Sequence, residues 1–320
     1  MNLADVIDGL IEAPVVTSFS RVGYAVRKRV DDWRPSWTYD MRDRTVVITG
    51  PTSGIGEAAA NAFARLGATL VLVARNESKV SELAERLSRD FGNDRISTVL
   101  ADLGDVDMVR EAGRRIAGEH DRVDVLVHNA GSLFNDRRTQ PDGTETTLAV
   151  HVVGPFLLTG VLLDSLEEGS RVITMSSGGM YTVPLTVGGI EMDPSSYKGA
   201  TQYALAKRAQ VTLNEMWAER VRRVRFHAMH PGWVDTPGVE DSLPGFHRLV
   251  GPVLRTPSQG ADTMVWLAAD PEPGTSSGRF WLDRRVRDIH KLARTRRSDT
   301  PERRGRLWEW VSARAGWDLR

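Results

Sequence analysis

The chain has 320 residues, enough to bury a sizeable core and to form one or two domains. Its 42 Lys and Arg residues balance its 42 Asp and Glu residues, so no overall charge attracts nucleic acid, and we expect no nucleic-acid partner. The sequence has no cysteine for a disulfide, a thiolate metal site or a cysteine nucleophile, and no apolar run of roughly 18 residues to span a bilayer, so we expect a cytoplasmic protein without a metal centre.

Residues 1–44 carry a helical stripe of apolar side chains. They recur every three or four positions at Phe19, Val22, Val26, Val30 and Trp33. Basic residues lie beside the stripe at Arg21, Arg27, Lys28 and Arg29. Such a helix either packs onto the core or makes peripheral contact with a membrane surface, and both interpretations stay open.

From residue 45 to residue 285, short β-branched runs alternate with longer amphipathic segments. We predict strands at 45–49, 69–74, 96–100, 123–131, 171–177, 224–230 and 278–282, and helices at 54–66, 77–89, 105–119, 143–166 and 201–220. The strands are continuously apolar, as in a parallel sheet covered on both faces. The pattern predicts one doubly wound α/β domain over residues 45–285, preceded by a helical extension (1–44) and followed by a tail (286–320).

A glycine-rich loop follows the first predicted strand, with the sequence Gly50-Pro51-Thr52-Ser53-Gly54-Ile55-Gly56. Between a strand and a helix, its backbone N–H groups and the positive helix end suit a diphosphate. The spacing G-x-x-x-G-x-G differs from the G-x-G-x-x-G fingerprint, and a tight turn also needs glycine. Taken alone, the loop leaves dinucleotide binding and a plain turn open.

Four further motifs follow in order: Asn129-Ala130-Gly131, Ser176-Ser177, Tyr203-x-x-x-Lys207 and Pro231-Gly232-Trp233-Val234-Asp235-Thr236. Together with Thr49-Gly50 and the glycine loop they resemble the short-chain dehydrogenase/reductase family, and RVITMSSGGM and HPGWVDTPGV resemble its member-twelve branch. The resemblance implies a Rossmann-like fold, an NAD(P) cofactor, hydride transfer between an alcohol and a carbonyl, and a homo-oligomer.

Hydride transfer to a carbonyl needs a proton donor, and a tyrosine phenol, with its ordinary pKa of about 10, can serve. Lys207 lies one helical turn after Tyr203, so its ammonium, together with an oxidised nicotinamide, would favour the phenolate. We predict Tyr203 as general acid/base, Lys207 as its electrostatic partner and ribose ligand, and Ser177 as hydrogen-bond donor to the substrate oxygen. Tyr24 and Lys28 share the spacing but lie upstream of the first strand, where a surface pair is expected.

Two departures from the family pattern stand out. Tyr203 follows Ser177 by 26 residues, about twice the family separation, so we expect the extra segment to wall the substrate pocket. His151 stands where family members commonly have an asparagine that holds a water in a proton relay. It either replaces that asparagine, since histidine donates and accepts hydrogen bonds, or is a buried structural residue. We interpret His128 as structural.

The resemblance also suggests the cofactor. Ala74 occupies the position of the acidic residue that binds the ribose of NAD, and Arg75 follows it, where a guanidinium suits a 2′-phosphate. We therefore predict NADP, with NAD possible. The remaining residues that match family cofactor contacts, besides the glycine loop, are Asp102, Leu103, Asn129, Ala130, Gly131, Tyr203, Lys207, Pro231, Gly232, Val234 and Thr236.

The substrate and the tail are less defined. Segments expected to cover the site have few charges and carry Met180, Tyr181, Leu185, Trp233, Leu243 and Phe246. This composition favours a lipophilic substrate. The basic, tryptophan-containing tail leaves membrane contact, a subunit interface and solvation open. Two other functions remain: a dinucleotide-binding sensor or scaffold without turnover, and a nucleotide-sugar epimerase, which the first-turn spacing disfavours.

Overall fold

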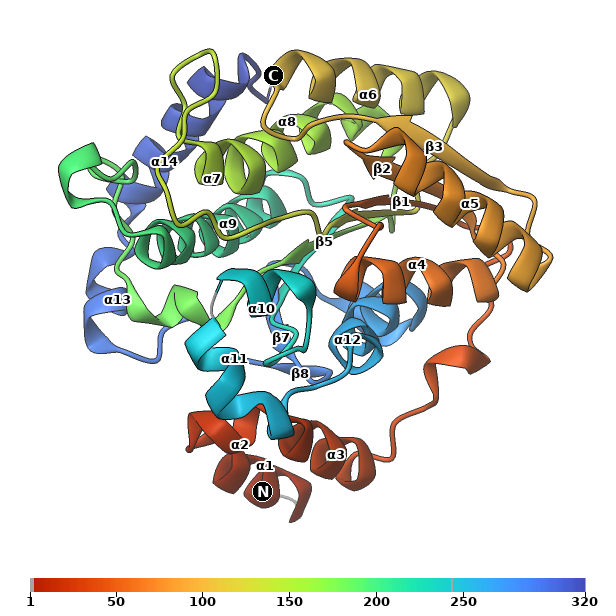
Figure 1. The fold of residues 1–320 in the computed structure, drawn as a ribbon, viewed down its shortest axis with the longest axis horizontal. Coiled ribbons are helices and arrows are strands. Elements are labelled where there is room, and N and C mark those ends of the chain that lie inside the picture. Colours follow the sequence, from red (N-terminus) through yellow and green to blue (C-terminus); the bar gives the residue numbers. More distant parts are fainter. Residues whose placement is uncertain (1–2, 243, 320) are drawn as a thin grey trace.

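The computed structural model describes residues 3–242 and 244–319, over which the chain forms one eight-stranded sheet with helices on both faces (Figure 1). The order is β3-β2-β1-β4-β5-β6-β7-β8, parallel except for β8. The strands are β1 Thr45–Thr49, β2 Thr69–Ala74, β3 Ile96–Leu100, β4 Val125–His128, β5 Arg171–Met175, β6 Arg225–Met229, β7 Arg279–Leu282 and β8 Arg285–Val286. The doubly wound α/β prediction is confirmed.

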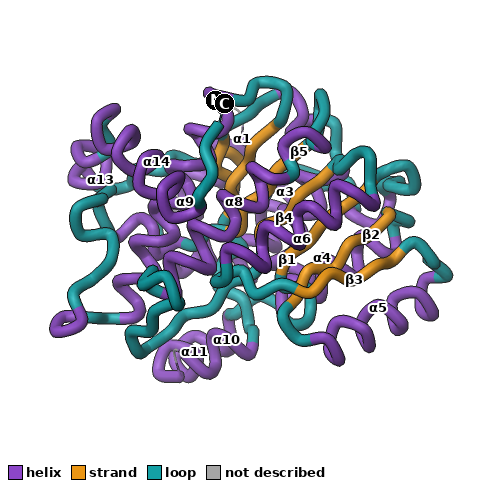
Figure 2. Tube along the Cα trace, turned by 90° about the horizontal axis from the view of Figure 1, so that it is seen from above, coloured by secondary structure: helices purple, strands orange, loops and turns teal. Residues whose placement is uncertain are grey.

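The helices form two layers with the sheet between them, and the strands run side by side in Figure 2. They are α1 Leu3–Glu12, α2 Val15–Phe19, α3 Arg21–Val30, α4 Gly54–Arg65, α5 Glu77–Phe91, α6 Val106–Glu119, α7 Thr146–Leu148, α8 Gly154–Val161, α9 Gly199–Arg220, α10 Pro237–Ser242, α11 Pro244–Val250, α12 Pro257–Ala269, α13 Ala293–Ser298 and α14 Pro301–Ala315. Apolar side chains of α6, α8, α9 and α14 form one core, and those of α4, α5 and α12 form the other.

The predicted helix over 143–166 is shorter and interrupted. It begins at Thr146, because the Glu145 carboxylate accepts hydrogen bonds from the N–H groups of Thr147 and Leu148. A π-helical turn, Ala149–Val153, then precedes α8. Pro155 has no N–H for the carbonyl of His151, four residues earlier, and that carbonyl accepts a hydrogen bond from Gln210 at 2.6 Å.

The N-terminal stripe does not lie on one helix: Phe19 ends α2, Val22, Val26 and Val30 belong to α3, and Trp33 follows α3. Ser20 separates α2 from α3 and caps α3 by accepting a hydrogen bond from the N–H of Val22. Phe19 and Trp33 are buried, whereas Val22 is exposed. These helices lie beside the β7–β8 hairpin (Figure 1), where Arg27 of α3 donates to Asp283. Part of the stripe therefore packs onto the rest of the protein, as one of the two interpretations proposed.

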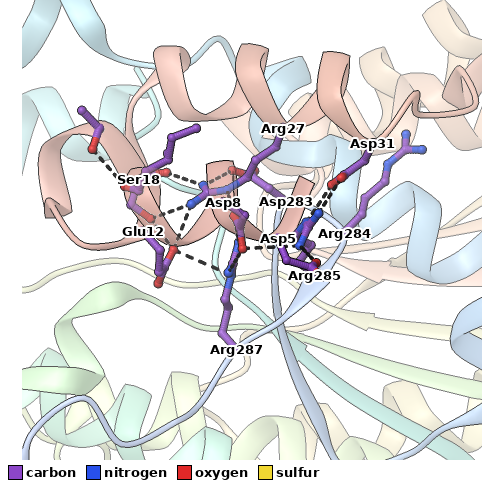
Figure 3. A network of polar contacts seen from close by, with 12 residues as sticks. Asp5, Asp8, Glu12, Ser18, Arg27, Asp31, Asp283, Arg284, Arg285 and Arg287 are labelled. Carbon is purple, nitrogen blue, oxygen red and sulfur yellow. Dashed lines mark hydrogen bonds and ion pairs between the residues drawn. The ribbon is translucent and has the colours of Figure 1, made fainter. Parts of the chain in front are cut away.

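The β7–β8 hairpin is held by buried ion pairs. Its turn residues, Asp283 and Arg284, have φ values of +55° and +56°, which side chains other than glycine rarely adopt. The Asp283 carboxylate accepts hydrogen bonds from Arg27 at 2.8 Å and from Arg255 at 2.6 and 2.8 Å (Figure 3 shows Asp283 and Arg27). Arg284 makes two hydrogen bonds of 2.8 Å to Asp262. These contacts offset the strain of the turn and join the N-terminal helices to the sheet edge.

The C-terminal tail packs onto the domain. Leu307, Trp308 and Val311 of α14 are buried in the core formed by α6, α8 and α9. The ring of Trp317 lies against Gly160 of α8, where a Cβ atom would come within 2.5 Å of it. Intramolecular packing therefore accounts for Trp308 and Trp317.

Replacing Asp283 with asparagine should lower the free energy of unfolding by about 3–5 kcal/mol, because buried Arg255 then keeps only carbonyl acceptors among the described residues. Urea denaturation measures this loss. Asp40→Asn, in the exposed Asp40–Arg42 pair, is the matched control and should cost less than about 1 kcal/mol. Equal losses in the two variants would contradict a supporting role for the buried pair.

Candidate functional site

The sheet order places a ligand site at the carboxyl ends of β1 and β4. The chain leaves β1 toward β2 on one side, whereas β4 continues toward β5 on the other. In an open α/β sheet, ligands bind where the strand order reverses in this way. The glycine loop follows β1 and Asn129 follows β4, so both border this position.

Hydrogen bonds from Asn129 and Thr49 fix the glycine loop. The Asn129 side-chain amide donates to the carbonyls of Thr49 (3.1 Å) and Gly50 (2.9 Å). The Thr49 hydroxyl accepts from the N–H groups of Asn129 and Ala130, both at 3.1 Å. Gly50 has φ +64°, and a Cβ on Gly56 would lie 2.1 Å from the Gly50 carbonyl oxygen. The loop therefore requires glycine, and its backbone at the start of α4 forms a cradle that suits a diphosphate.

The structure brings several other predicted cofactor residues to this edge. A Cβ on Gly54 would lie 3.1 Å from the methyl group of Thr236, so the segment after β6 approaches the glycine loop. Arg75 is exposed directly after β2, and no described residue forms an ion pair with it. Asp102 follows β3 and accepts a hydrogen bond from the N–H of Gly104 at 2.8 Å. Leu103 is buried, whereas Gly131 is exposed.

Ser177, Tyr203 and Lys207 meet beyond the end of β5. The hydroxyl of Ser177 is hydrogen-bonded to that of Tyr203. Lys207 lies one turn further along α9, with its Nζ 5.3 Å from the centroid of the Tyr203 ring, and donates to the Met175 carbonyl at 2.8 Å. Ser176 instead donates to the backbone carbonyl of Lys207 at 3.3 Å, as expected for the structural member of the serine pair.

Burial shifts the pKa values of Tyr203 and Lys207 in opposite directions. It raises the pKa of Tyr203 to about 12, although the hydrogen bond from Ser177 lowers that pKa. It lowers the pKa of Lys207 to about 7. In the protein by itself, loss of solvation therefore dominates the pKa of Tyr203. That Lys207 and an oxidised nicotinamide together favour the phenolate stays a prediction. Tyr203 is a neutral phenol at physiological pH.

His151 lies against the same pair. Its ring meets that of Tyr203 edge-on at 5.3 Å between centroids. Its Nε2 lies 2.9 Å from the carbonyl oxygen and 3.2 Å from the N–H of Ser132, so its tautomer decides whether it donates or accepts there. Burial and the nearby Lys207 hold its pKa well below the usual value, so it is neutral. Its Nδ1 has no hydrogen-bond partner among the described residues. The structure thus brings His151 to the predicted catalytic group.

The segment between Ser177 and Tyr203 was expected to form a wall of the substrate pocket, but its first apolar residues pack into the core instead. Met180, Tyr181 and Leu185 are buried in the protein core, and the Tyr181 hydroxyl donates to the carbonyl of Asp288 at 3.0 Å. They pack inward because the N-terminal and C-terminal segments cover them. Leu243 and the side chain of Phe246 lie outside the described residues.

Sequence reasoning missed two supports of the site. Phe19 accepts a hydrogen bond from the N–H of Trp233 at 2.7 Å, and its ring lies where a Cβ on Gly178 would come within 2.8 Å. Arg255 donates to the carbonyl of Pro231 at 3.1 Å. The sequence showed Phe19 only as part of an apolar stripe, and Arg255 lies in no motif, so only the fold reveals that they hold the segments next to Ser177 and Thr236.

Known proteins resemble this chain in sequence and fold. The family described as short chain dehydrogenase matches residues 44–244. Human dehydrogenase/reductase SDR family member 12 is 38% identical over 262 residues, covering 81% of this chain and 82% of that protein. Mouse retinol dehydrogenase 12 is 31% identical over 310 residues, covering 92% and 94%. The structure of L-sorbose reductase from Gluconobacter frateurii, complexed with NADPH and L-sorbose, is 23% identical with a TM-score of 0.61, covering 77% and 96%, and shares the fold.

Membrane insertion through a helix has no support in the described part of the chain. None of the helices there combines the length and the apolar composition that crossing a bilayer requires.

Gly131 and His151 should be energetically coupled. A Cβ on Gly131 would lie 2.2 Å from Cε1 of His151, so Gly131→Ala should destabilise the protein by about 1–3 kcal/mol. In a His151→Asn background, which removes the ring, the same change should cost much less. Chemical denaturation of the two single variants and the double variant measures this coupling, and equal costs in both backgrounds would contradict the close approach.

Proposed function

The chain belongs to the short-chain dehydrogenase/reductase family, and from this premise we propose that it is an NADP-preferring oxidoreductase that interconverts an alcohol and a carbonyl. The observation that carries the proposal is the hydrogen-bonded Ser177–Tyr203 pair with Lys207 one turn later, beyond the end of β5. The β5 strand neighbours β4, and β4 neighbours β1, so this group and the glycine loop share one edge of the sheet.

Tyr203 is suited to donate a proton when a carbonyl is reduced. A bound nicotinamide cofactor supplies the hydride in this direction. Because burial keeps the phenol neutral, Tyr203 carries the proton that the carbonyl oxygen needs. Ser177, next to it, provides a second hydrogen-bond donor for the same oxygen. Lys207, anchored to the Met175 carbonyl, stabilises the phenolate that proton donation leaves behind.

The residues around the glycine loop fit NADP. The loop backbone and the N-terminus of α4 suit the diphosphate, and the close approach of Gly56 to Gly50 leaves no room for larger residues. Arg75 is exposed at the end of β2 and free of ion pairs with described residues, so its guanidinium can bind a 2′-phosphate. Ala74 offers no carboxylate for the ribose of NAD. These features favour NADP over NAD without excluding NAD.

A lipophilic substrate remains part of the proposal. Support comes from the 31% identity to a protein named retinol dehydrogenase 12 and from Trp233, which is partly exposed beside the predicted cofactor segment. Met180, Tyr181 and Leu185 pack inward, so they no longer support a lipophilic substrate as residues that cover the site. Peripheral membrane contact, a cytoplasmic location and a homo-oligomer stay predictions.

A dinucleotide-binding sensor without turnover is the second candidate. The observation that favours it is His151 in the position of the family's relay asparagine. A neutral histidine whose Nδ1 has no partner among the described residues can still donate or accept a hydrogen bond there, according to its tautomer, so this replacement is compatible with catalysis. Turnover measurements separate the two candidates.

Replacing Tyr203 with phenylalanine should abolish carbonyl reduction while NADPH binding changes less than about threefold, because the change removes only the proton donor. NADPH and NADH oxidation over aliphatic, retinoid-like and steroid-like carbonyls measures turnover, and quenching of protein fluorescence measures binding. We expect NADPH to be the better cofactor. Tight NADPH binding without turnover of any carbonyl by the native protein would support the sensor instead.

The two reaction directions should depend differently on pH. Alcohol oxidation requires the phenolate of Tyr203, which is scarce far below a pKa of about 12, so the oxidation rate should rise with pH by up to about tenfold per unit. Carbonyl reduction uses the neutral phenol and should change little from neutral to mildly alkaline pH. Initial rates at saturating cofactor test this difference, with circular dichroism to confirm folding at each pH. An oxidation rate independent of pH would argue against Tyr203 as the base.

A further inference from the structure

A polar stripe runs along α9 from the catalytic group into the apolar core. Tyr203, Lys207, Gln210 and Asn214 are spaced four, three and four residues apart, so they share one face of the helix. Lys207, Gln210 and Asn214 are 2%, 5% and 4% exposed. Two neutral amides this deep in a core require hydrogen-bond partners, because an unpaired buried amide is costly.

The stripe borders an internal cavity of about 30 Å³. The cavity lies among β4, β5, β6, α8 and α9, and Val172, Leu213, Trp217 and Phe226 form part of its apolar lining. Its polar lining consists of His128, His151, Thr159, Thr174, Gln210 and Asn214. The volume exceeds the roughly 10–15 Å³ that a cavity needs to hold a water molecule.

The hydrogen-bonding state of His128 follows from its neighbour. The Thr159 hydroxyl donates its only proton to the carbonyl of Pro155 at 2.8 Å. It therefore accepts from His128 Nε2, at 2.8 Å, and Nδ1 keeps a lone pair. Burial lowers the pKa of His128 to about 3, so the ring stays neutral. His128 Nδ1 is thus a buried acceptor without a partner among the described residues.

The two amides add further unpaired groups to His128 Nδ1 and to His151 Nδ1, which also borders the cavity. Gln210 Nε2 donates to the carbonyl of His151, which leaves the Oε1 acceptor of Gln210 without a partner among the described residues. Asn214 lacks described partners for both Nδ2 and Oδ1. The cavity lining therefore offers one donor and several acceptors.

We propose that the cavity binds one ordered water molecule that donates to His128 Nδ1 and Gln210 Oε1 and accepts from Asn214 Nδ2. A water molecule donates two hydrogen bonds and accepts up to two, so one molecule can pair with these three groups. The water site is independent of the proposed enzymatic function. Only its effect on catalysis rests on that function.

Through this water, Gln210 and Asn214 are positioning residues for the catalytic group. The water fixes which way the Gln210 amide points, and Gln210 then holds the His151 carbonyl, for which Pro155 has no N–H four residues later. His151 in turn lies edge-on against Tyr203. Asn214 is two turns from Lys207 and reaches the site only through this chain of contacts.

Asn214→Leu tests the water site by the sign of a stability change. If water occupies the cavity, leucine removes its donor and leaves acceptors unpaired, so the melting temperature should fall by at least about 3 °C. If the cavity holds no water, leucine removes an unpaired amide and the melting temperature should rise, which overturns the proposal. Thr212→Val, a buried polar-to-apolar change on α9 outside the cavity lining, is the matched control and should change it by less than about 2 °C.

A high-resolution crystal structure of the native protein gives the direct test. Density for one water within hydrogen-bond distance of His128 Nδ1, Gln210 Oε1 and Asn214 Nδ2 supports the site, and an empty cavity overturns it. Both this test and the melting temperature are decisive even if no carbonyl is turned over.

The positioning role has its own measurement. With a carbonyl that the native protein reduces, Asn214→Leu should lower kcat by about three- to tenfold and leave the dissociation constant of NADPH within about twofold, because only the approach of His151 to Tyr203 changes. Thr212→Val should leave both values unchanged. An unchanged kcat in Asn214→Leu would overturn the positioning role while leaving the water site to the structural tests.

Discussion

The enclosure of α9 is the constraint on which the rest of the structure depends. This helix is surrounded by protein along most of its length, so each of its polar side chains needs a partner in the interior. Lys207 donates to Met175 at the end of β5, and Arg208 donates to the carbonyls of Met180 (3.1 Å) and Ile289 (2.9 Å). Gln202 donates to Ile190 at 2.8 Å. These contacts bind α9 to the sheet, to the segment after Ser177 and to the tail, and so fix Tyr203 relative to β5.

A second set of buried charges joins the N-terminal helices to the segment after β6, which is predicted to contact the cofactor. Asp283 joins Arg27 of α3 to Arg255, and Arg255 also donates to the carbonyl of Pro231. Phe19 meets the same segment through the N–H of Trp233. Because a buried carboxylate is stable only with its partners in place, the N-terminal helices and the segment containing Pro231 and Trp233 form one cooperative unit. The N-terminal helices thus belong to the scaffold of the site.

The sequence predicted what local patterns encode. Continuous apolar runs located the central strands, and the spacing of Tyr203 and Lys207 placed both on one helix face, as observed. It could not predict partners far apart in the chain: Arg27 and Asp283 are 256 residues apart, and neither lies in a motif. Gln210 and Asn214 resemble ordinary polar residues on an exposed helix face, and only burial shows that they border a cavity. The sequence likewise could not predict that Met180 packs inward, because Phe19, which covers it, comes from a distant segment.

Burial also determines how the catalytic group responds to charge. It disfavours the phenolate of Tyr203 and the ammonium of Lys207 alike, and their pKa values move to about 12 and about 7. Around neutral pH the uncharged phenol therefore predominates while Lys207 is poised between its two forms. His151, also neutral, adds no charge of its own. A charge that a ligand brings to this edge then changes the protonation of Lys207 more than that of Tyr203, because the pKa of Lys207 lies nearer to the ambient pH. The group is accordingly built to hold a proton on Tyr203 until a bound ligand changes the local field, which suits a proton donor better than a permanently ionised base.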